Sequence, residues 1–158
     1  MSDWESHEGD HWATNADRYT RMLAGYGQIL TDAAAPAPGE RVLDVGCGCG
    51  DVSLAAGHAV GAAGAVRGVD LSPAMLAVAR ARAAEAGLDH VELVRADAAT
   101  HRPDPAGFDL VVSRFGVMFF DDPVRAFANL RRAATPKADL KVIVWRSPAE
   151  NPFMTAAE

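Results

Sequence analysis

The sequence predicts an α/β fold built on a parallel sheet, and three observations support this. Short apolar segments alternate with longer stretches in which apolar residues recur three or four positions apart, a pattern typical of strands separated by helices. A glycine-rich turn, Gly46-Cys47-Gly48-Cys49-Gly50, directly follows the first of these apolar segments. Polar residues follow the next three segments at the points where strands would end. Such alternation implies right-handed crossovers and a sheet covered by helices on both faces.

The composition is that of one ordinary globular domain. The chain has 158 residues, of which 49% are hydrophobic and 23% charged, enough to bury a sizeable core. The formal net charge of −6 gives no electrostatic footprint for nucleic acid, so no such partner is indicated. Residues 1–12 are polar, and no apolar run reaches membrane-spanning length. The two cysteines, one residue apart, fit a reduced, cytoplasmic setting better than a disulfide framework.

The N-terminal residues 1–35 are expected to form a helical lid on the main domain, residues 36–158. Between Asp10 and Leu30 the apolar positions fall three or four apart, which indicates one or two helices with an apolar face. The Pro/Gly stretch Ala35–Glu40 then separates this lid from the first strand.

Five strands and three helices are expected in the main domain. The strands are expected at 41–45, 65–70, 91–97, 108–115 and 140–145. The helices are expected at 51–60, 72–87 and 122–134. Ser72 and Pro73 form a typical helix start, and Gly87 a typical stop. The last strand is apolar apart from Lys141, so we expect it to be covered on both faces.

The residues that end the strands indicate the ligand, because open α/β sheets bind ligands at the carboxyl ends of their strands. Asp70 can accept hydrogen bonds from ribose hydroxyls, and Asp97 can accept one from an exocyclic amine. A nicotinamide dinucleotide would favour a G-x-G-x-x-G turn with a helix start free for its pyrophosphate. Here Asp51 follows the turn and Asp44 lies inside the first strand. Both acids favour a cationic, phosphate-free nucleoside such as S-adenosylmethionine.

Four segments together resemble a known family: "VLDVGCGCG", "GVDLSPAMLAVAR", "RADA" and "FDLVVSRFGVMFFDDP". Their order, spacing and strand placement are similar to the successive motifs of class I S-adenosylmethionine-dependent methyltransferases, most closely the ubiquinone/menaquinone-biosynthesis-like group. The resemblance runs from about Trp12 to Trp145. It implies a Rossmann-like three-layer sheet with strand order 3-2-1-4-5. It also implies methyl transfer to a small-molecule acceptor, with S-adenosylhomocysteine as product.

The resemblance also implies a set of cofactor-binding residues, although it names no catalytic base. The amino-acid half of the cofactor would contact Asp44, Gly46, Cys47 and Gly48, with Ser113 and Arg114 beside the methionine moiety. The nucleoside half would contact Asp70 at the ribose, and Leu71, Met75, Asp97 and Ala98 around the adenine. The lid would contribute Trp12, Arg18 and Tyr19.

This chain departs from the family pattern near its end. The turn before the last strand reads Pro136-Lys137-Ala138-Asp139 instead of Pro-Gly-Gly, and the usual C-terminal antiparallel hairpin is absent. The open edge of the strand at 140–145 would suit pairing with a second copy in a homodimer. Two alternatives to a methyltransferase therefore stay open: a cofactor-binding remnant or subunit without turnover, and an NAD(P)-dependent oxidoreductase.

Several conspicuous polar residues are interpreted as structural. His7 to His11 spell H-E-x-x-H, but Gly9 lies inside the motif in a polar, frayed N-terminus, so no metal is expected. His58, His90 and His101 are expected at the surface or in loops. Arg80 and Arg82 are expected to form a solvated helix face.

Overall fold

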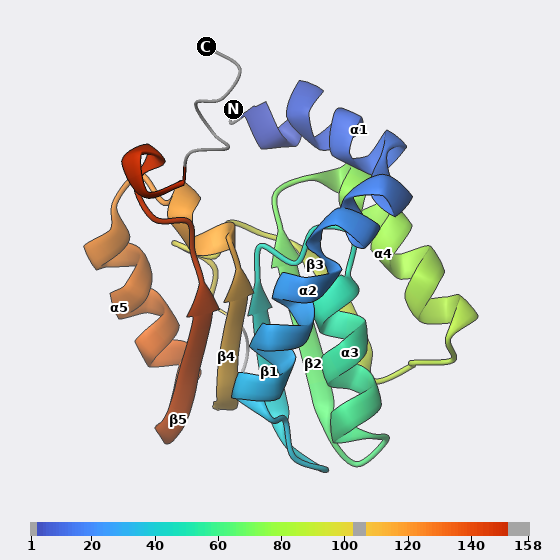
Figure 1. Ribbon diagram of the computed structural model, residues 1–158. Coiled ribbons are helices and arrows are strands. Elements are labelled where there is room, and N and C mark those ends of the chain that lie inside the picture. Colours follow the sequence, from blue (N-terminus) through green and yellow to red (C-terminus); the bar gives the residue numbers. More distant parts are fainter. Residues whose placement is uncertain (1–2, 103–106, 152–158) are drawn as a thin grey trace.

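The computed structural model describes residues 3–102 and 107–151 and contains one five-stranded sheet. The strands are β1 (Arg41–Val45), β2 (Ala65–Asp70), β3 (Val91–Arg95), β4 (Phe108–Arg114) and β5 (Ala134–Ile143). Every neighbouring pair is parallel, and the order is β3-β2-β1-β4-β5. The predicted fold class and strand order are thereby confirmed. All the carboxyl ends lie at one edge of the sheet, the top in Figure 1.

Helices cover both faces of this sheet, as the alternation predicts. The α-helices are α1 (His7–Thr14), α2 (Ala16–Ala34), α3 (Asp51–Val60), α4 (Pro73–Glu85) and α5 (Pro123–Ala133). Three short 3-10 turns are η1 (Asp3–Glu5), η2 (Gly116–Phe119) and η3 (Pro148–Glu150). One core joins the sheet to α2, α3 and α4 and contains Leu30, Val52 and Leu76. A second core on the other face joins the sheet to α5 and η2 through Leu130 and Val117.

The helix starts follow from local side-chain chemistry. Ser72 Oγ accepts a hydrogen bond of 3.2 Å from the Met75 amide, and Pro73 takes the first position of α4. Asp122 does the same for α5, accepting a 3.0 Å bond from the Arg125 amide. These caps satisfy backbone donors that the first helical turn leaves without partners. The predicted start of α4 is therefore confirmed.

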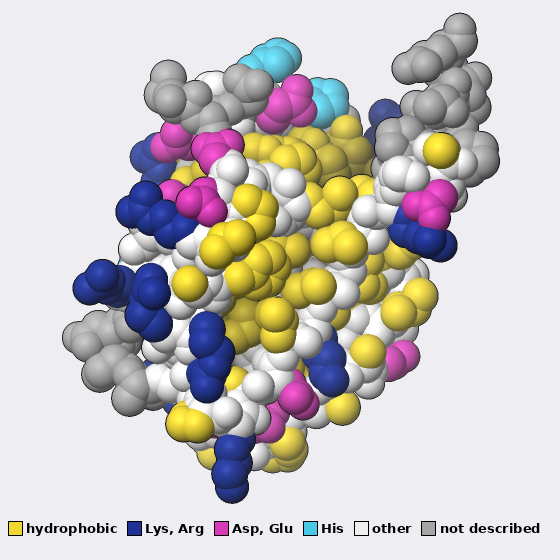
Figure 2. Space-filling model, turned by 90° about the vertical axis from the view of Figure 1, so that its left-hand side faces the viewer, with side chains coloured by type: hydrophobic (Ala, Val, Ile, Leu, Met, Phe, Trp, Pro, Cys, Tyr) yellow, Lys and Arg dark blue, Asp and Glu magenta, His cyan; other side chains and the backbone are white. Residues whose placement is uncertain are grey.

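The last strand differs from its prediction in two ways. β5 begins at Ala134, directly after α5, and its register with β4 shifts between Ala134 and Asp139. It is also not covered on both faces, because Leu140, Val142 and Val144 are 48%, 37% and 47% exposed. Leu140 pairs in register with Val111 on the face that carries α5, so α5 leaves this stripe only partly covered. Figure 2 shows that side of the molecule, with hydrophobic side chains at its centre and Lys and Arg side chains around them, most of them on the left.

No helix in residues 3–102 and 107–151 combines the length and apolar character that crossing a membrane requires.

Candidate functional site

A cleft of about 750 Å³ opens at the carboxyl ends of β1 to β4. It extends from the loop after β3, past the glycine turn after β1, to aromatic residues that follow β4 and β5. The N-terminal elements η1, α1 and α2 contribute the remaining wall. This size is within the range of clefts that hold a small-molecule ligand, and the position is where open α/β sheets bind one.

The glycine turn is shaped by backbone that only glycine adopts easily. Gly46, Gly48 and Gly50 have φ angles of 69°, 54° and 89°, in the left-handed region that disfavours side chains. A Cβ on Gly48 would come within 2.8 Å of the Met75 methyl group. The Gly46 and Cys47 amides donate bonds of 2.9 and 3.1 Å to the Val69 carbonyl of β2. The turn is therefore fixed to the neighbouring strand and exposes bare backbone to the cleft.

Asp70, at the end of β2, connects this turn to the start of α4. Its Oδ2 accepts a 2.8 Å bond from the Gly48 amide, and its Oδ1 accepts a 2.9 Å bond from the Ser72 amide. Burial raises the pKa of this carboxyl, while the amides of Ser72 and Gly48 act in the opposite direction. An acid at the end of an apolar strand thus has the partners that its burial requires. It also lines the cleft.

Asp44 lies underneath the glycine turn and does not line the cleft. It is fully buried, and its Oδ2 accepts a 2.6 Å hydrogen bond from Ser53 Oγ on α3. Burial raises the pKa of this carboxyl to about 6, although the Ser53 bond and the Arg114 charge lower it. Asp44 is therefore a structural neighbour of the turn rather than an exposed anion beside the ligand.

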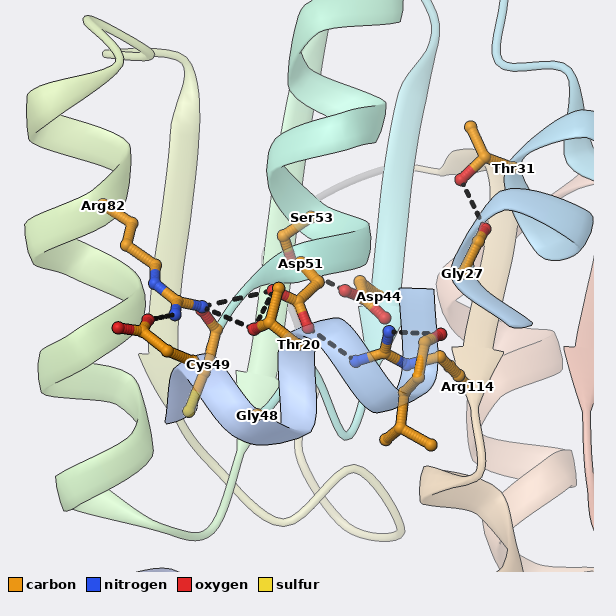
Figure 3. A network of polar contacts seen from close by, with 12 residues as sticks. Thr20, Gly27, Thr31, Asp44, Gly48, Cys49, Asp51, Ser53, Arg82 and Arg114 are labelled. Atoms are coloured by element: carbon orange, nitrogen blue, oxygen red, sulfur yellow. Dashed lines mark hydrogen bonds and ion pairs between the residues drawn. The ribbon is translucent and has the colours of Figure 1, made fainter. Parts of the chain in front are cut away.

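Asp51, the first residue of α3, is held between two arginines (Figure 3). Its Oδ2 accepts a 2.8 Å bond from Arg114, and its Oδ1 accepts bonds from Arg82 at 3.2 Å and Thr20 at 2.9 Å. The two guanidinium groups compensate its charge. Neither acid therefore presents an uncompensated charge to the cleft, and their preference for a cationic ligand stays a prediction.

Of the two arginines of α4, Arg80 is exposed as predicted, whereas Arg82 differs from its prediction as part of a solvated face. Arg82 points toward Asp51, and its side chain is only 23% exposed. Arg80 donates bonds of 3.1 and 2.7 Å to the Leu93 carbonyl of β3. Both are anchored because neighbouring elements present oxygen acceptors to them, a feature that periodicity along one helix does not reveal.

The Asp97 side chain stabilises the turn that follows β3 by bonding to residues two and three positions further along. It accepts bonds from the Ala99 amide at 2.8 Å and from Thr100 Oγ1 at 3.2 Å. This turn places Asp97 and Ala98 in the cleft wall, opposite Leu71 and Met75 on the start of α4.

The N-terminal helices cover the same end of the cleft. Trp12 of α1 stacks on Tyr19 of α2, with ring centroids 3.8 Å apart and planes 14° apart. α1 is a regular helix and not a frayed segment, because Gly9 has no side chain and so packs directly against Ser72. His11 lies in this helix, and its Nε2 is 3.1 Å from the Tyr19 hydroxyl. In residues 3–102 and 107–151, no three His, Cys, Asp or Glu side chains group as metal ligands would.

The structure brings most of the sequence-predicted site residues together around one cleft. Those that line it are Trp12, Tyr19, Gly46, Cys47, Gly48, Asp70, Leu71, Met75, Asp97, Ala98 and Arg114. Asp44, Ser113 and Arg18 do not line it: Ser113 is buried and bonded to the Val45 carbonyl, and Arg18 is exposed. The binding roles of all of these residues stay predictions.

An aromatic group at the other end of the cleft is only partly visible in the sequence, where the run after the fourth strand fits a pocket wall and a core equally well. Phe115 and Trp145 stack with centroids 4.6 Å apart and planes 3° apart, and Tyr26 of α2 meets both rings edge-on. Phe115 has a φ of 69°, a strained conformation for an aromatic residue that is often associated with functional sites. The run "RFGVMFF" after the fourth strand is the sequence signal for this group, but Trp145 and Tyr26 join it only in three dimensions.

Comparisons with known proteins agree with this geometry. A family model described as a methyltransferase domain matches residues 42–137. Aklanonic acid methyltransferase DauC of Streptomyces sp. (strain C5) is 42% identical over 103 residues, 65% of this chain and 47% of that protein. A demethylmenaquinone methyltransferase of Shouchella clausii is 39% identical over 110 residues, 70% and 47% of the two chains.

A comparison with solved structures also identifies a methyltransferase as similar. A phosphoethanolamine N-methyltransferase 2 of Haemonchus contortus, in complex with phosphomonomethylethanolamine and S-adenosylhomocysteine, superposes with a TM-score of 0.68. It is 27% identical, and the match covers 83% of this chain and 32% of that one. The present chain spans about half the length of the curated relatives it matches.

Proposed function

We propose, from the premise that this chain belongs to the methyltransferase domain family, that it binds S-adenosylmethionine and transfers a methyl group to a small-molecule acceptor. The observation that carries this proposal is the cleft itself. A bare glycine backbone, Asp70 and Asp97 follow three successive strands and face one cavity. A nucleoside with a charged amino-acid tail needs these three features at one edge of a sheet.

The residues present fit this cofactor. The left-handed glycines leave room that a Cβ would fill, so the cofactor can lie directly against the backbone. Asp70 would accept hydrogen bonds from the ribose hydroxyls, and Asp97 with Ala98 would border the adenine. Trp12 and Tyr19 would cover the nucleoside and exclude water.

The same geometry argues against an NAD(P)-dependent oxidoreductase. A pyrophosphate would lie at the N-terminus of the helix after the glycine turn. In this chain that helix start, α3, carries the Asp51 carboxylate, which already satisfies two arginines. Because both arginines are already paired with this carboxylate, they are not free to bind a pyrophosphate.

The protein would contribute mainly proximity and orientation. Bound S-adenosylmethionine supplies a methyl group that is already activated for displacement. The chain would hold the acceptor in line with that methyl group, against the wall formed by Phe115, Trp145 and Phe119. We assign no general base.

A second candidate is cofactor binding without turnover unless a partner completes the acceptor side, and the position of β5 at the edge of the described sheet favours it. β5 is one of the two outer strands of the described sheet, and its outer edge would accept a strand from a second copy. A cytoplasmic location is proposed as well.

Calorimetry with S-adenosylhomocysteine and with NADH tests the cofactor assignment. We expect binding of the first and not of the second, and the reverse result would replace the proposal with the oxidoreductase. A transfer assay with methyl-labelled S-adenosylmethionine and a panel of small acceptors then separates an enzyme from a binding subunit. Light scattering on the same sample reports whether a dimer forms.

A further inference from the structure

We propose that Arg82 is a positioning residue that locks helix α2 onto the glycine turn and so limits how fast the cofactor leaves the cleft. This inference rests on the proposed function only in taking S-adenosylmethionine as the occupant of the cleft. The lock itself is a claim about α2 and is testable without a ligand.

Arg82 connects three parts of the molecule from its position on α4. Its Nη1 donates to the Cys49 carbonyl in the glycine turn at 3.3 Å and to Asp51 Oδ1 at the start of α3 at 3.2 Å. The same nitrogen lies 3.2 Å from Thr20 Oγ1 on α2. Its Nη2 donates to Asp17 Oδ1, also on α2, at 2.9 Å. One side chain thereby joins α2 to the turn that shapes the cleft.

Asp51 is the centre of this network, and Arg114 holds α2 from the other side. Figure 3 shows Asp51 between Arg82 and Arg114. Arg114 donates to Asp51 at 2.8 Å and to the Leu23 carbonyl of α2 at 3.4 Å. Gly27 of α2 provides space for this arginine, since a Cβ there would lie 3.2 Å from Nη1.

The burial of these groups makes the lock stronger than a surface ion pair. The side chains of Arg82, Asp51 and Arg114 are 23%, 20% and 14% exposed. Exposed ion pairs contribute little, whereas removing one member of a partly buried, hydrogen-bonded network costs more, because its partners lose their compensation. Asp17, at 85% exposure, is the weak member by the same reasoning.

The network acts on the part of α2 that borders the cleft. Tyr19, Thr20 and Leu23 all line the cleft, and they lie in the first half of the helix. The second half is anchored in the main core through Leu30, whereas the buried residues of the first half, Ala16 and Leu23, lie outside that core. Loss of the network would therefore loosen the cleft-lining half and leave the fold intact.

The forked shape of the guanidinium explains why arginine is suited to this position. Nη2 contacts Asp17 while Nη1 serves three oxygens on other elements. A lysine ammonium has a single nitrogen, so it cannot contact Asp17 and the oxygens of the other elements at the same time.

Hydrogen exchange and ligand dissociation in Arg82→Gln test the lock, with Arg80→Gln as the matched control. Arg80 lies on the same helix and also donates two bonds, but to β3 and not to α2. We expect Arg82→Gln to raise amide exchange in residues 16–24 and to speed S-adenosylhomocysteine release about tenfold, the loss of roughly one charge-assisted hydrogen bond. Arg80→Gln should leave both unchanged, and Arg82→Lys should fall between parent and Arg82→Gln.

Two results would overturn the lock: unchanged exchange in residues 16–24 of Arg82→Gln, or an equal increase in Arg80→Gln. Slower S-adenosylhomocysteine association with unchanged release in Arg82→Gln would also contradict the lock, because the lock holds α2 in place after the ligand has bound. If the parent chain binds no S-adenosylhomocysteine, the proposed function and the release rate claimed here are both wrong. In that case, amide exchange in residues 16–24 of Arg82→Gln and Arg80→Gln still confirms or overturns the lock.

Discussion

Ser53 Oγ donates a 2.6 Å hydrogen bond to Asp44, and both side chains are buried under the glycine turn. The bond joins β1 to α3, and the pKa of the Asp44 carboxyl is raised to about 6. Burial is the main cause of the raised pKa, and the Ser53 bond opposes it. A buried acid of this kind costs stability whenever it is ionised.

The pH dependence of stability follows from the direction of that shift. The pKa of Asp44 is higher in the folded chain than the ordinary value of 3.8. Its contribution to folding is therefore fully present below about pH 4 and is lost as the pH rises to about 6. We expect Asp44→Asn to gain stability relative to the parent at pH 8, by on the order of 3 kcal/mol at most, and to show no such gain at pH 4. Urea unfolding at the two pH values measures this.

Ser53→Ala is the companion variant for that experiment. It removes the bond that lowers the pKa of Asp44, so its loss of stability should be larger at pH 8 than at pH 4. An Asp44→Asn gain that is equal at both pH values would show that charge burial is not the cause.

Gly116 and Gly46 make a close backbone contact that a side chain would disrupt. A Cβ on Gly116 would meet the Val45 carbonyl oxygen and come within 2.8 Å of the Gly46 Cα. Since both neighbours are backbone, we expect Gly116→Ala to lower the free energy of unfolding by about 3 kcal/mol, the upper range for overpacking.

Gly25→Ala is the matched control, because Gly25 lies inside α2 and a Cβ at this position would have nothing within 4 Å. It should raise the free energy of unfolding by about 0.5–1 kcal/mol through helix propensity. Thermal unfolding of both variants suffices, and equal effects of the two substitutions would refute the contact argument.

Asp70→Ala should weaken S-adenosylhomocysteine binding by roughly tenfold to a hundredfold, the scale of hydrogen bonds to a charged group. The variant also releases the amides of Gly48 and Ser72, so circular dichroism must first show that it is folded. Glu92→Ala serves as control, since that carboxylate pairs with Arg67 and does not line the cleft. Unchanged affinity in folded Asp70→Ala would place the ribose site elsewhere.

The sequence predicted what depends on local pattern and missed what depends on distant partners. The strands and the cap at Ser72 follow from periodicity and cap chemistry, and the position of Asp70 follows from a strand end. The strand order follows from the family resemblance. Arg82 was misread because its partners on α2 lie more than 60 residues away in sequence. The exposure of β5 was misread because an apolar run does not show what covers it.

The three tryptophans of the chain provide a last test, since Trp4, Trp12 and Trp145 all line the cleft. Trp12 stacks on Tyr19 at the end assigned to the cofactor, whereas Trp145 stacks on Phe115 at the end assigned to the acceptor. We expect S-adenosylhomocysteine to change the intrinsic fluorescence of the parent, and Trp12→Phe to remove most of that change. Trp145→Phe should retain it, because its ring lies outside the cofactor end. If Trp145→Phe abolishes the change and Trp12→Phe does not, the two ends of the cleft have been assigned in the wrong order.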